Sequence, residues 1–286
     1  MSKPMNGKTV VITGANSGIG FCAARDLVGM GATVVMACRR LEAAEQAMND
    51  IRASHPAASL AVVRLDVSSI ASVNEASDEL LSRFPRIDVL VNNAGIANLR
   101  RKESVDGFEM TFATNHLGPF LLTNRLLPAL EAAQGRIVNV ASVAHAGGTM
   151  HFDDLNLNRG YNVLKAYAQS KLANMLFTWE LSKRLEGTGV TVNALHPGAV
   201  NTNIWPGDHW YERAMSWVIR RFTITPDEGS RTTVWLASSD EVAGESGGYY
   251  QDCRPQKRRS TARDDQAAER LWRLSADWVG LSEDGG

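Results

Sequence analysis

Short runs of β-branched and apolar residues alternate with longer segments of helical periodicity along the chain. The first run, Thr9 to Thr13 (TVVIT), is typical of a strand that is buried on both faces of a parallel sheet. A glycine-rich turn follows it, and then a helical stretch from Ile19 to Met30 that Gly31 ends. This order of strand, turn and helix recurs to the end of the chain.

The same reading predicts the remaining elements. Further strands are expected at Thr33 to Ala37, Ser59 to Asp66, Ile87 to Asn92, Arg136 to Ala141, Val190 to Leu195 and Gly248 to Gln251. Further helices are expected at Leu41 to Ser54, Ser69 to Phe84, Phe108 to Glu131, Val163 to Leu185, Asp227 to Ser238 and Asp264 to Val279. Strands that alternate with helices form a parallel sheet with helices on both faces. We therefore expect one α/β domain over residues 1–286, a doubly wound Rossmann fold of about seven strands that binds its ligands beyond the strands' carboxyl ends.

Composition and charge narrow the class of protein. The chain has a formal net charge of -1 and is 44% hydrophobic, so no strong field draws it to nucleic acid or to a membrane. Its three cysteines lack CxxC or metal-ligand spacing, which favours a reducing compartment and no metal site. Neither a secretory signal nor an apolar run of about 18 residues is apparent. We expect a cytoplasmic protein without a membrane anchor, and we interpret the basic stretch Gln256 to Arg263 as a solvated turn rather than a nucleic-acid site.

The turn after the first strand has the chemistry of a phosphate-binding loop. Glycine lets the backbone turn tightly and approach a pyrophosphate, and the start of the following helix supplies free N–H groups. The spacing is Gly-x-x-x-Gly-x-Gly, which alone could also be an ordinary tight turn. Its position between an apolar strand and a helix favours a dinucleotide. The expected contacts are Gly14, Asn16, Ser17, Gly18, Ile19 and Gly20.

The residues at the ends of the next strands refine the cofactor. The second strand ends without a carboxylate before Glu42, and Arg39 offers a planar fork that suits the 2′-phosphate of NADP(H). Arg40 is a second candidate, and both could instead be solvated surface charges. Asp66, followed by Val67, either accepts a hydrogen bond from the adenine amino group or caps the next helix. Small residues let the chain pass beneath the adenosine ribose at Asn93, Ala94 and Gly95.

Three residues predict the reaction. Tyr167 and Lys171 share one helical face, and Ser142 ends the fifth strand. A phenol with a pKa near 10 is a poor base, and a cation nearby favours the phenolate. Lowering that pKa by about three units takes roughly 4 kcal/mol, which Lys171 and an oxidised nicotinamide ring could share. Ser142 would hold the substrate oxygen beside Tyr167, which would give or take the proton as hydride moves.

Together these motifs resemble the short-chain dehydrogenase/reductase family. TGANSGIG, Asp66, NNAG, Asn115, Ser142, YAQSK and HPG occur in the family's order and span nearly the whole chain. The resemblance implies that Asn115 is a fourth catalytic residue, in a bent segment that holds a water linking Lys171 to solvent. It also implies that Pro197, Gly198 and Thr202 contact the nicotinamide, and that the protein is a homodimer or homotetramer.

A narrower resemblance concerns one branch of the family. FATNHLGPFLLTNRLLP, LHPGAVNTNI and GGYYQDC resemble the retinol dehydrogenase and WW-domain oxidoreductase branch. Neither the membrane anchor that many retinol dehydrogenases carry nor a WW domain is expected from this sequence. The resemblance therefore implies the cofactor chemistry of the branch, and not its substrates.

The stretch most suited to substrate binding lacks clean periodicity. Asn201 to Thr225 is rich in aromatic residues and is expected to form a substrate lid, over about residues 199–226. The same aromatic residues could instead pack the segment onto the domain. The sequence thus predicts an NADP(H)-dependent oxidoreductase that interconverts a carbonyl and an alcohol on a bulky apolar or aromatic small molecule. The alternatives are an NADP(H) sensor without turnover and an epimerase or dehydratase that oxidises its substrate transiently.

Overall fold

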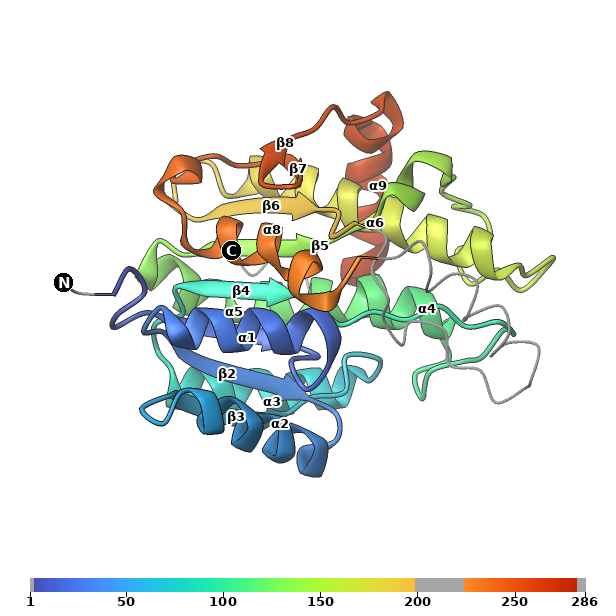
Figure 1. Cartoon of the computed structure of the whole chain (residues 1–286). Coiled ribbons are helices and arrows are strands. Elements are labelled where there is room, and N and C mark those ends of the chain that lie inside the picture. The colour runs from blue at the N-terminus through green and yellow to red at the C-terminus, as the bar shows by residue number, and fades with distance from the viewer. Residues whose placement is uncertain (1–2, 199–223, 282–286) are drawn as a thin grey trace.

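A twisted sheet of eight strands forms the centre of the computed structural model, which describes residues 3–198 and 224–281 (Figure 1). The strands are β1 (Thr9–Thr13), β2 (Thr33–Cys38), β3 (Ser59–Arg64), β4 (Val89–Asn92), β5 (Arg136–Val140), β6 (Thr191–Leu195), β7 (Tyr249–Gln251) and β8 (Arg254–Pro255). They lie in the order β3-β2-β1-β4-β5-β6-β7-β8, and every neighbouring pair is parallel except β7 with β8. The order reverses between β1 and β4, which is where a doubly wound sheet binds its ligand.

Helices cover both faces of this sheet. The long helices are α1 (Gly18–Gly29), α2 (Leu41–Ser54), α3 (Ile70–Arg83), α5 (Gly118–Ala133), α6 (Val163–Arg184), α8 (Pro226–Ser238) and α9 (Asp265–Trp278). Short helices are α4 (Met110–Phe112), η1 (Ala113–Leu117), η2 (Val143–Gly147), η3 (Asp240–Val242) and η4 (Ser260–Arg263). Side chains alternate along each strand, so Val10 and Ile12 join one apolar layer and Val11 joins the other. The first layer packs under α1, α2 and α8, and the second under α3, α5, α6 and α9.

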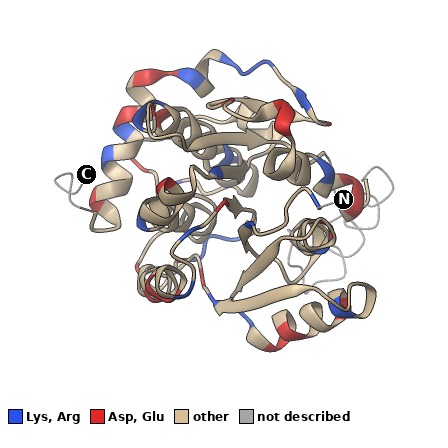
Figure 2. Ribbon diagram, turned by 90° about the vertical axis from the view of Figure 1, so that its left-hand side faces the viewer, with Lys and Arg blue, Asp and Glu red and all other residues tan. Residues whose placement is uncertain are grey.

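Most charged residues lie away from the sheet. In Figure 2 the basic and the acidic residues are scattered over the outer helices and loops. No helix in residues 3–198 and 224–281 is long and apolar enough to cross a membrane.

The expected long helix from Phe108 to Glu131 divides into three segments, and the bent segment that the family resemblance implies at Asn115 is a π-helix. The short α4 is capped by the Glu109 carboxylate, whose oxygens accept from the N–H groups of Thr111 and Phe112 at 2.8 Å. A π-helix, η1, comes next, and α5 then begins at Gly118. A Cβ atom on Gly118 would lie 1.8 Å from the carbonyl oxygen of Val67, so only glycine lets the start of α5 pack against the segment that follows β3. This close contact lies directly after the π-helix, whose turns are wider than those of an α-helix.

The sheet also has one strand more than the sequence predicts. The turn between β7 and β8 is made by Asp252 and Cys253, whose φ angles are 51° and 55°. Such turns are usually marked by glycine or asparagine, and a two-residue strand is too short for a periodic pattern. Every other expected element lies within two residues of its observed bounds.

Candidate active site

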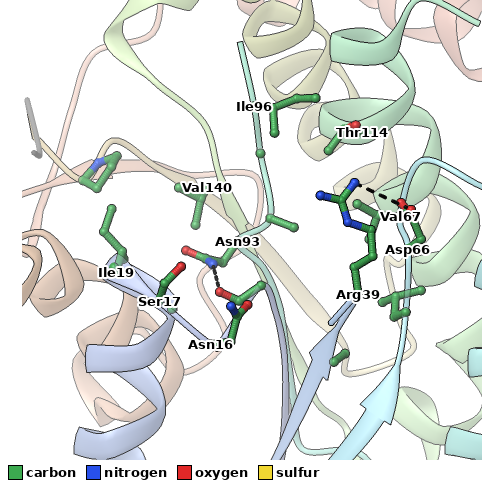
Figure 3. A pocket seen from close by; sticks show the side chains of 18 of the residues that line it. Asn16, Ser17, Ile19, Arg39, Asp66, Val67, Asn93, Ile96, Thr114 and Val140 are labelled. Atoms are coloured by element: carbon green, nitrogen blue, oxygen red, sulfur yellow. Dashed lines mark hydrogen bonds and ion pairs between the residues drawn. The ribbon is translucent and has the colours of Figure 1, made fainter. Parts of the chain in front are cut away.

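A cleft of about 540 Å³ opens at the carboxyl ends of the central strands (Figure 3). Among its lining residues are Gly14, Asn16, Ser17, Gly18, Ile19, Gly20, Arg39, Arg40, Asp66, Val67, Asn93, Ala94, Gly95, Tyr167, Lys171 and Pro197. These are all the residues that the sequence analysis expects to contact the cofactor, apart from two. Gly198 is described but does not line the cleft, and Thr202 lies outside the described residues. The expected lid also lies outside them, except for its last residues, 224–226.

The glycine turn is closed by contacts with the end of β4. Gly14 and Gly18 have φ angles of 66° and 56°, a region that favours glycine. A Cβ atom on Gly20 would lie 2.5 Å from the Gly14 carbonyl oxygen and 2.6 Å from Nδ2 of Asn93. Asn93 in turn donates from Nδ2 to the carbonyl oxygen of Thr13, at 2.8 Å. The turn is therefore held open toward the cleft, with no room for larger side chains behind it.

The amino terminus of α1 points into this turn. Ser17 is its N-cap residue, and its side chain makes no capping hydrogen bond. The first N–H groups of a helix lack partners within the helix, and together they carry a partial positive charge. The donors and the charge both suit a phosphate group. The residues of this turn therefore fit the pyrophosphate of a dinucleotide.

Arg39 and Asp66 face one another across the ends of β2 and β3 (Figure 3). Nη1 of Arg39 lies 3.8 Å from Oδ2 of Asp66, and the Arg39 side chain is 69% exposed. The other carboxylate oxygen of Asp66 accepts from the backbone N–H and the hydroxyl of Ser68, at 3.0 and 2.6 Å. Ser69, not Asp66, is the N-cap of α3. Asp66 thus binds the turn ahead of α3 without capping the helix, and its contact with the adenine stays a prediction for a residue that lines the cleft.

Ser142, Tyr167 and Lys171 come together at the end of β5. Ser142 is the N-cap of η2, where its Oγ accepts from the N–H of Ala144 at 3.2 Å, and its side chain also forms a hydrogen bond with Tyr167. On α6, Nζ of Lys171 lies 5.6 Å from the centre of the Tyr167 ring. Lys171 is 4% exposed, and its Nζ donates to the carbonyl oxygen of Val140 at 2.8 Å. A phenol, a hydroxyl and an amine thus share one buried corner beside the cleft.

Burial governs the ionisation of this group. It lowers the pKa of Lys171 to about 8. Burial also raises the pKa of Tyr167, and the hydrogen bond from Ser142 partly offsets that rise. The pKa of Tyr167 is therefore raised in the chain by itself, whereas the sequence analysis expects it to be lowered when an oxidised nicotinamide is bound.

Asn115 lies in the π-helix and uses its whole side chain for hydrogen bonds. Oδ1 accepts from the N–H of Ile96 at 2.8 Å, and Nδ2 donates to the Ile96 carbonyl and to Oγ of Ser170, both at 2.9 Å. A Cβ atom on Gly95 would lie 3.3 Å from Oδ1 of Asn115 and 3.5 Å from Nζ of Lys171. Asn115 is buried behind the cleft and ties its floor to α6.

The sequence analysis missed some lining residues. These are Ala37, Leu65, Ile96, Thr114, Val140 and Ala141, whereas Pro226 falls at the end of the expected lid. Most of them are small or apolar and adjoin a predicted residue in sequence. Position at a strand end was the one signal that could have found them.

Comparisons with known proteins find relatives over nearly the whole chain. A model of the short chain dehydrogenase family matches residues 8–209. Human retinol dehydrogenase 14 is 46% identical and aligns with 97% of this chain and 88% of its own. Human retinol dehydrogenase 13 is 42% identical, over 96% of this chain and 85% of its own.

Solved structures of similar fold extend over most of the chain. An uncharacterized protein from Mycobacterium paratuberculosis has a TM-score of 0.79 and 37% identity, over 96% of this chain and 94% of its own. A short chain dehydrogenase from Shigella flexneri, complexed with NADP, has a TM-score of 0.69 and 22% identity, over 87% of this chain and 98% of its own. The second likeness shows the fold alone.

Proposed function

Because this chain belongs to the short-chain dehydrogenase family, and is thus an oxidoreductase acting between alcohols and carbonyls, we propose that it uses NADP(H) and reduces a bulky apolar or aromatic carbonyl compound. The observation that carries the proposal is the shared cleft. The glycine turn that fits a pyrophosphate and the pair Tyr167 and Lys171 line the same cavity. A dinucleotide held in the turn would extend toward the phenol that handles the proton.

Arg39 supports the choice of NADP(H). Its guanidinium is exposed at the end of β2 and lines the cleft, so it is free to close on a phosphate. No acidic residue stands at the end of β2, where a carboxylate would repel that phosphate. Asp66 lies 3.8 Å from Arg39 and would compete for its charge, which a doubly charged phosphate outweighs.

Each reacting side chain has a proposed task. Ser142 donates a hydrogen bond to the substrate oxygen and holds it beside Tyr167. The raised pKa of Tyr167 keeps its phenol protonated at neutral pH, so the phenol can give its proton to that oxygen. Lys171 binds the cofactor ribose and stabilises the phenolate that remains. Bound NADPH supplies the hydride in the same cleft.

Two exposed apolar side chains support an apolar substrate. Val143 directly follows Ser142 and is 58% exposed, and Leu164 is 65% exposed. Leu164 lies one turn before Tyr167 on α6, on the side of the helix that carries Lys171. The relatives named retinol dehydrogenases act on an alcohol of this apolar kind.

The first test is turnover. Purified protein should consume NADPH with a panel of aldehydes and ketones that includes retinal, aromatic and aliphatic compounds. Tyr167→Phe should lower kcat by about 10³-fold or more, while NADPH still binds with near-native affinity, because the phenol acts on the proton and not on the cofactor. Tyr161→Phe is the matched control, since the Tyr161 hydroxyl donates to the Asn98 carbonyl at 2.6 Å and lies outside the catalytic group. If wild type binds NADPH and turns over nothing in the panel, the sensor interpretation gains and the proposed reaction fails.

The second test is cofactor choice. Arg39→Asp should lower kcat/KM for NADPH by about 100-fold and change that for NADH far less, because it replaces a phosphate-binding fork by a repelling carboxylate. Arg64→Asp, at the exposed end of β3 and outside the cleft lining, is the control. An unchanged ratio of the two cofactors in Arg39→Asp would remove Arg39 from the site.

A further inference from the structure

Asn174 is a buried amide one turn beyond Lys171 on α6. It is 7% exposed and does not line the cleft. A polar side chain costs free energy inside a helix interface unless its hydrogen bonds are made. The hydrogen-bond partners of Asn174 therefore indicate which segments its side chain holds together.

The orientation of the amide follows from those partners. With Nδ2 directed toward the carbonyl oxygens of Asn115 and Ser170, it donates to both, at 2.7 and 3.2 Å. The opposite orientation would point the amide oxygen at the same two oxygens, which repel it. In the favourable orientation the amide oxygen faces hydrogen-bond donors.

The acceptor on the π-helix has a special position. A π-helix replaces the usual spacing of backbone hydrogen bonds, and side chains commonly bond to carbonyl groups at such irregularities. The Asn115 carbonyl is bound in this way by Asn174, while the Asn115 side chain holds Ile96 and Ser170. Asn174 therefore ties the π-helix to α6 through the Asn115 carbonyl, in addition to the bond from the Asn115 side chain to Ser170.

The other end of the amide approaches the carbonyl oxygen of Val140, at 3.4 Å, and that oxygen accepts from Nζ of Lys171 at 2.8 Å. This end of the amide faces hydrogen-bond donors, so in the favourable orientation it carries the amide oxygen. One end of Asn174 thus binds the π-helix that carries Asn115, and the other approaches the carbonyl group that binds Lys171.

We propose that Asn174 is a positioning residue, whose Nδ2 holds the Asn115 carbonyl and whose Oδ1 accepts from Nζ of Lys171. It fixes the ammonium group between Val140 and Tyr167. This inference rests on the proposed function for its effect on turnover, but its effect on Lys171 can be measured without a substrate or cofactor.

The groups near Lys171 that titrate are few. Tyr167 precedes it by one turn on α6, and His196, which follows β6, senses its charge. His145, on η2, interacts with His196. Burial lowers the pKa of His145, and it lowers that of His196 to about 4, so both histidines are neutral where Lys171 titrates.

The experiment compares Asn174→Leu, Asn174→Asp and a control, Asn139→Leu. Asn139 is 2% exposed, accepts from Asn92 and donates to Thr178, so it is a buried amide of equal type that contacts neither Lys171 nor Asn115. The pKa of Lys171 is measured in the cofactor-free protein by labelling with acetic anhydride over a range of pH, followed by peptide mass spectrometry. Steady-state kcat and the KM for NADPH are measured as well, with a carbonyl that wild type reduces.

Asn174→Leu removes the acceptor and should lower the pKa of Lys171 by about one unit, whereas the carboxylate of Asn174→Asp should raise it by at least as much. In Asn174→Leu kcat should fall about tenfold, or about 1.4 kcal/mol in the barrier, with the KM for NADPH changed less than about threefold. Asn139→Leu should lower the melting temperature without moving the Lys171 pKa.

A merely structural role predicts another outcome. The proposal is overturned if both Asn174 variants lower the melting temperature like Asn139→Leu and leave the Lys171 pKa in place. If Asn174→Leu does not fold, the near-isosteric Asn174→Asp decides alone, since an unchanged pKa in it refutes the contact. If wild type reduces no carbonyl, the proposed function fails, and the labelling still tests Asn174.

Discussion

Replacing His116 by glutamine should flatten the dependence of the chain's stability on pH. The imidazole is 1% exposed, and it packs against the rings of Phe112, Phe120 and Phe177 in the layer beneath η1. Its Nε2 lies 2.8 Å from Oγ of Ser275 on α9. Burial lowers the pKa of His116 from 6.5 to about 3, because a charged ring would lose its hydration there.

The sign follows from where the proton binds. The folded pKa lies below the unfolded one, so on acidification the unfolded chain takes up the proton first and is favoured. The contribution of His116 to stability is complete above pH 6.5 and is lost as the pH falls through 6.5 toward 3. At pH 5 the loss is 1.5 pH units at 1.36 kcal/mol each, or about 2 kcal/mol.

Urea unfolding at pH 8 and pH 5 measures this loss. Glutamine does not titrate and can still bond to Ser275, so His116→Gln should lose about 2 kcal/mol less than wild type between the two pH values. Burial also lowers the pKa values of His145 and His196, but these residues titrate equally in both proteins and cancel in the difference. Equal losses in the two proteins would refute the assignment of a buried neutral ring.

Two further substitutions test the packing around the cleft. Gly118→Ala would place its Cβ 1.8 Å from the Val67 carbonyl oxygen, so urea unfolding should show a loss of about 3 kcal/mol or more, and a loss below 1 kcal/mol would contradict the contact. Thr225 and Glu228 form a capping box at the start of α8, so Thr225→Ala should cost about 1 kcal/mol in the same assay, with Thr261→Ala, an exposed residue on η4, as the neutral reference.

Sequence patterns predicted most elements because burial on both faces of a parallel sheet leaves a plain apolar signature. They failed at Ala113–Leu117, where helical periodicity cannot distinguish bonds to the fourth residue from bonds to the fifth. What accompanies the π-helix there is contact between Gly118 and Val67, which are far apart in sequence. The strand β8 was missed for a different reason, since its turn uses Asp252 and Cys253 in a conformation that their residue types do not signal.

The candidate site was predictable where side chains carry the chemistry. Gly14, Tyr167 and Lys171 belong to motifs, and their place after a strand or on a helix follows from the alternating order of elements. Val140 was not predicted, because its contact with Lys171 is made by its carbonyl oxygen, a group that every residue type has. Asn174 was not predicted, because a polar residue in a helical sequence indicates a surface position, and only the packing shows that it is buried.

The protonation states of Tyr167 and Lys171 bear on the direction of the proposed reaction. With its pKa lowered to about 8, Lys171 is still mostly charged at pH 7, and the raised pKa of Tyr167 leaves the phenol intact. A phenol beside an ammonium group is arranged to give up a proton, because the phenolate left behind gains a cation nearby. Taking up a proton would instead require a phenolate that burial disfavours in the chain itself. In the proposed reaction these protonation states favour reduction, and oxidation of an alcohol would depend on additional positive charge in the cleft.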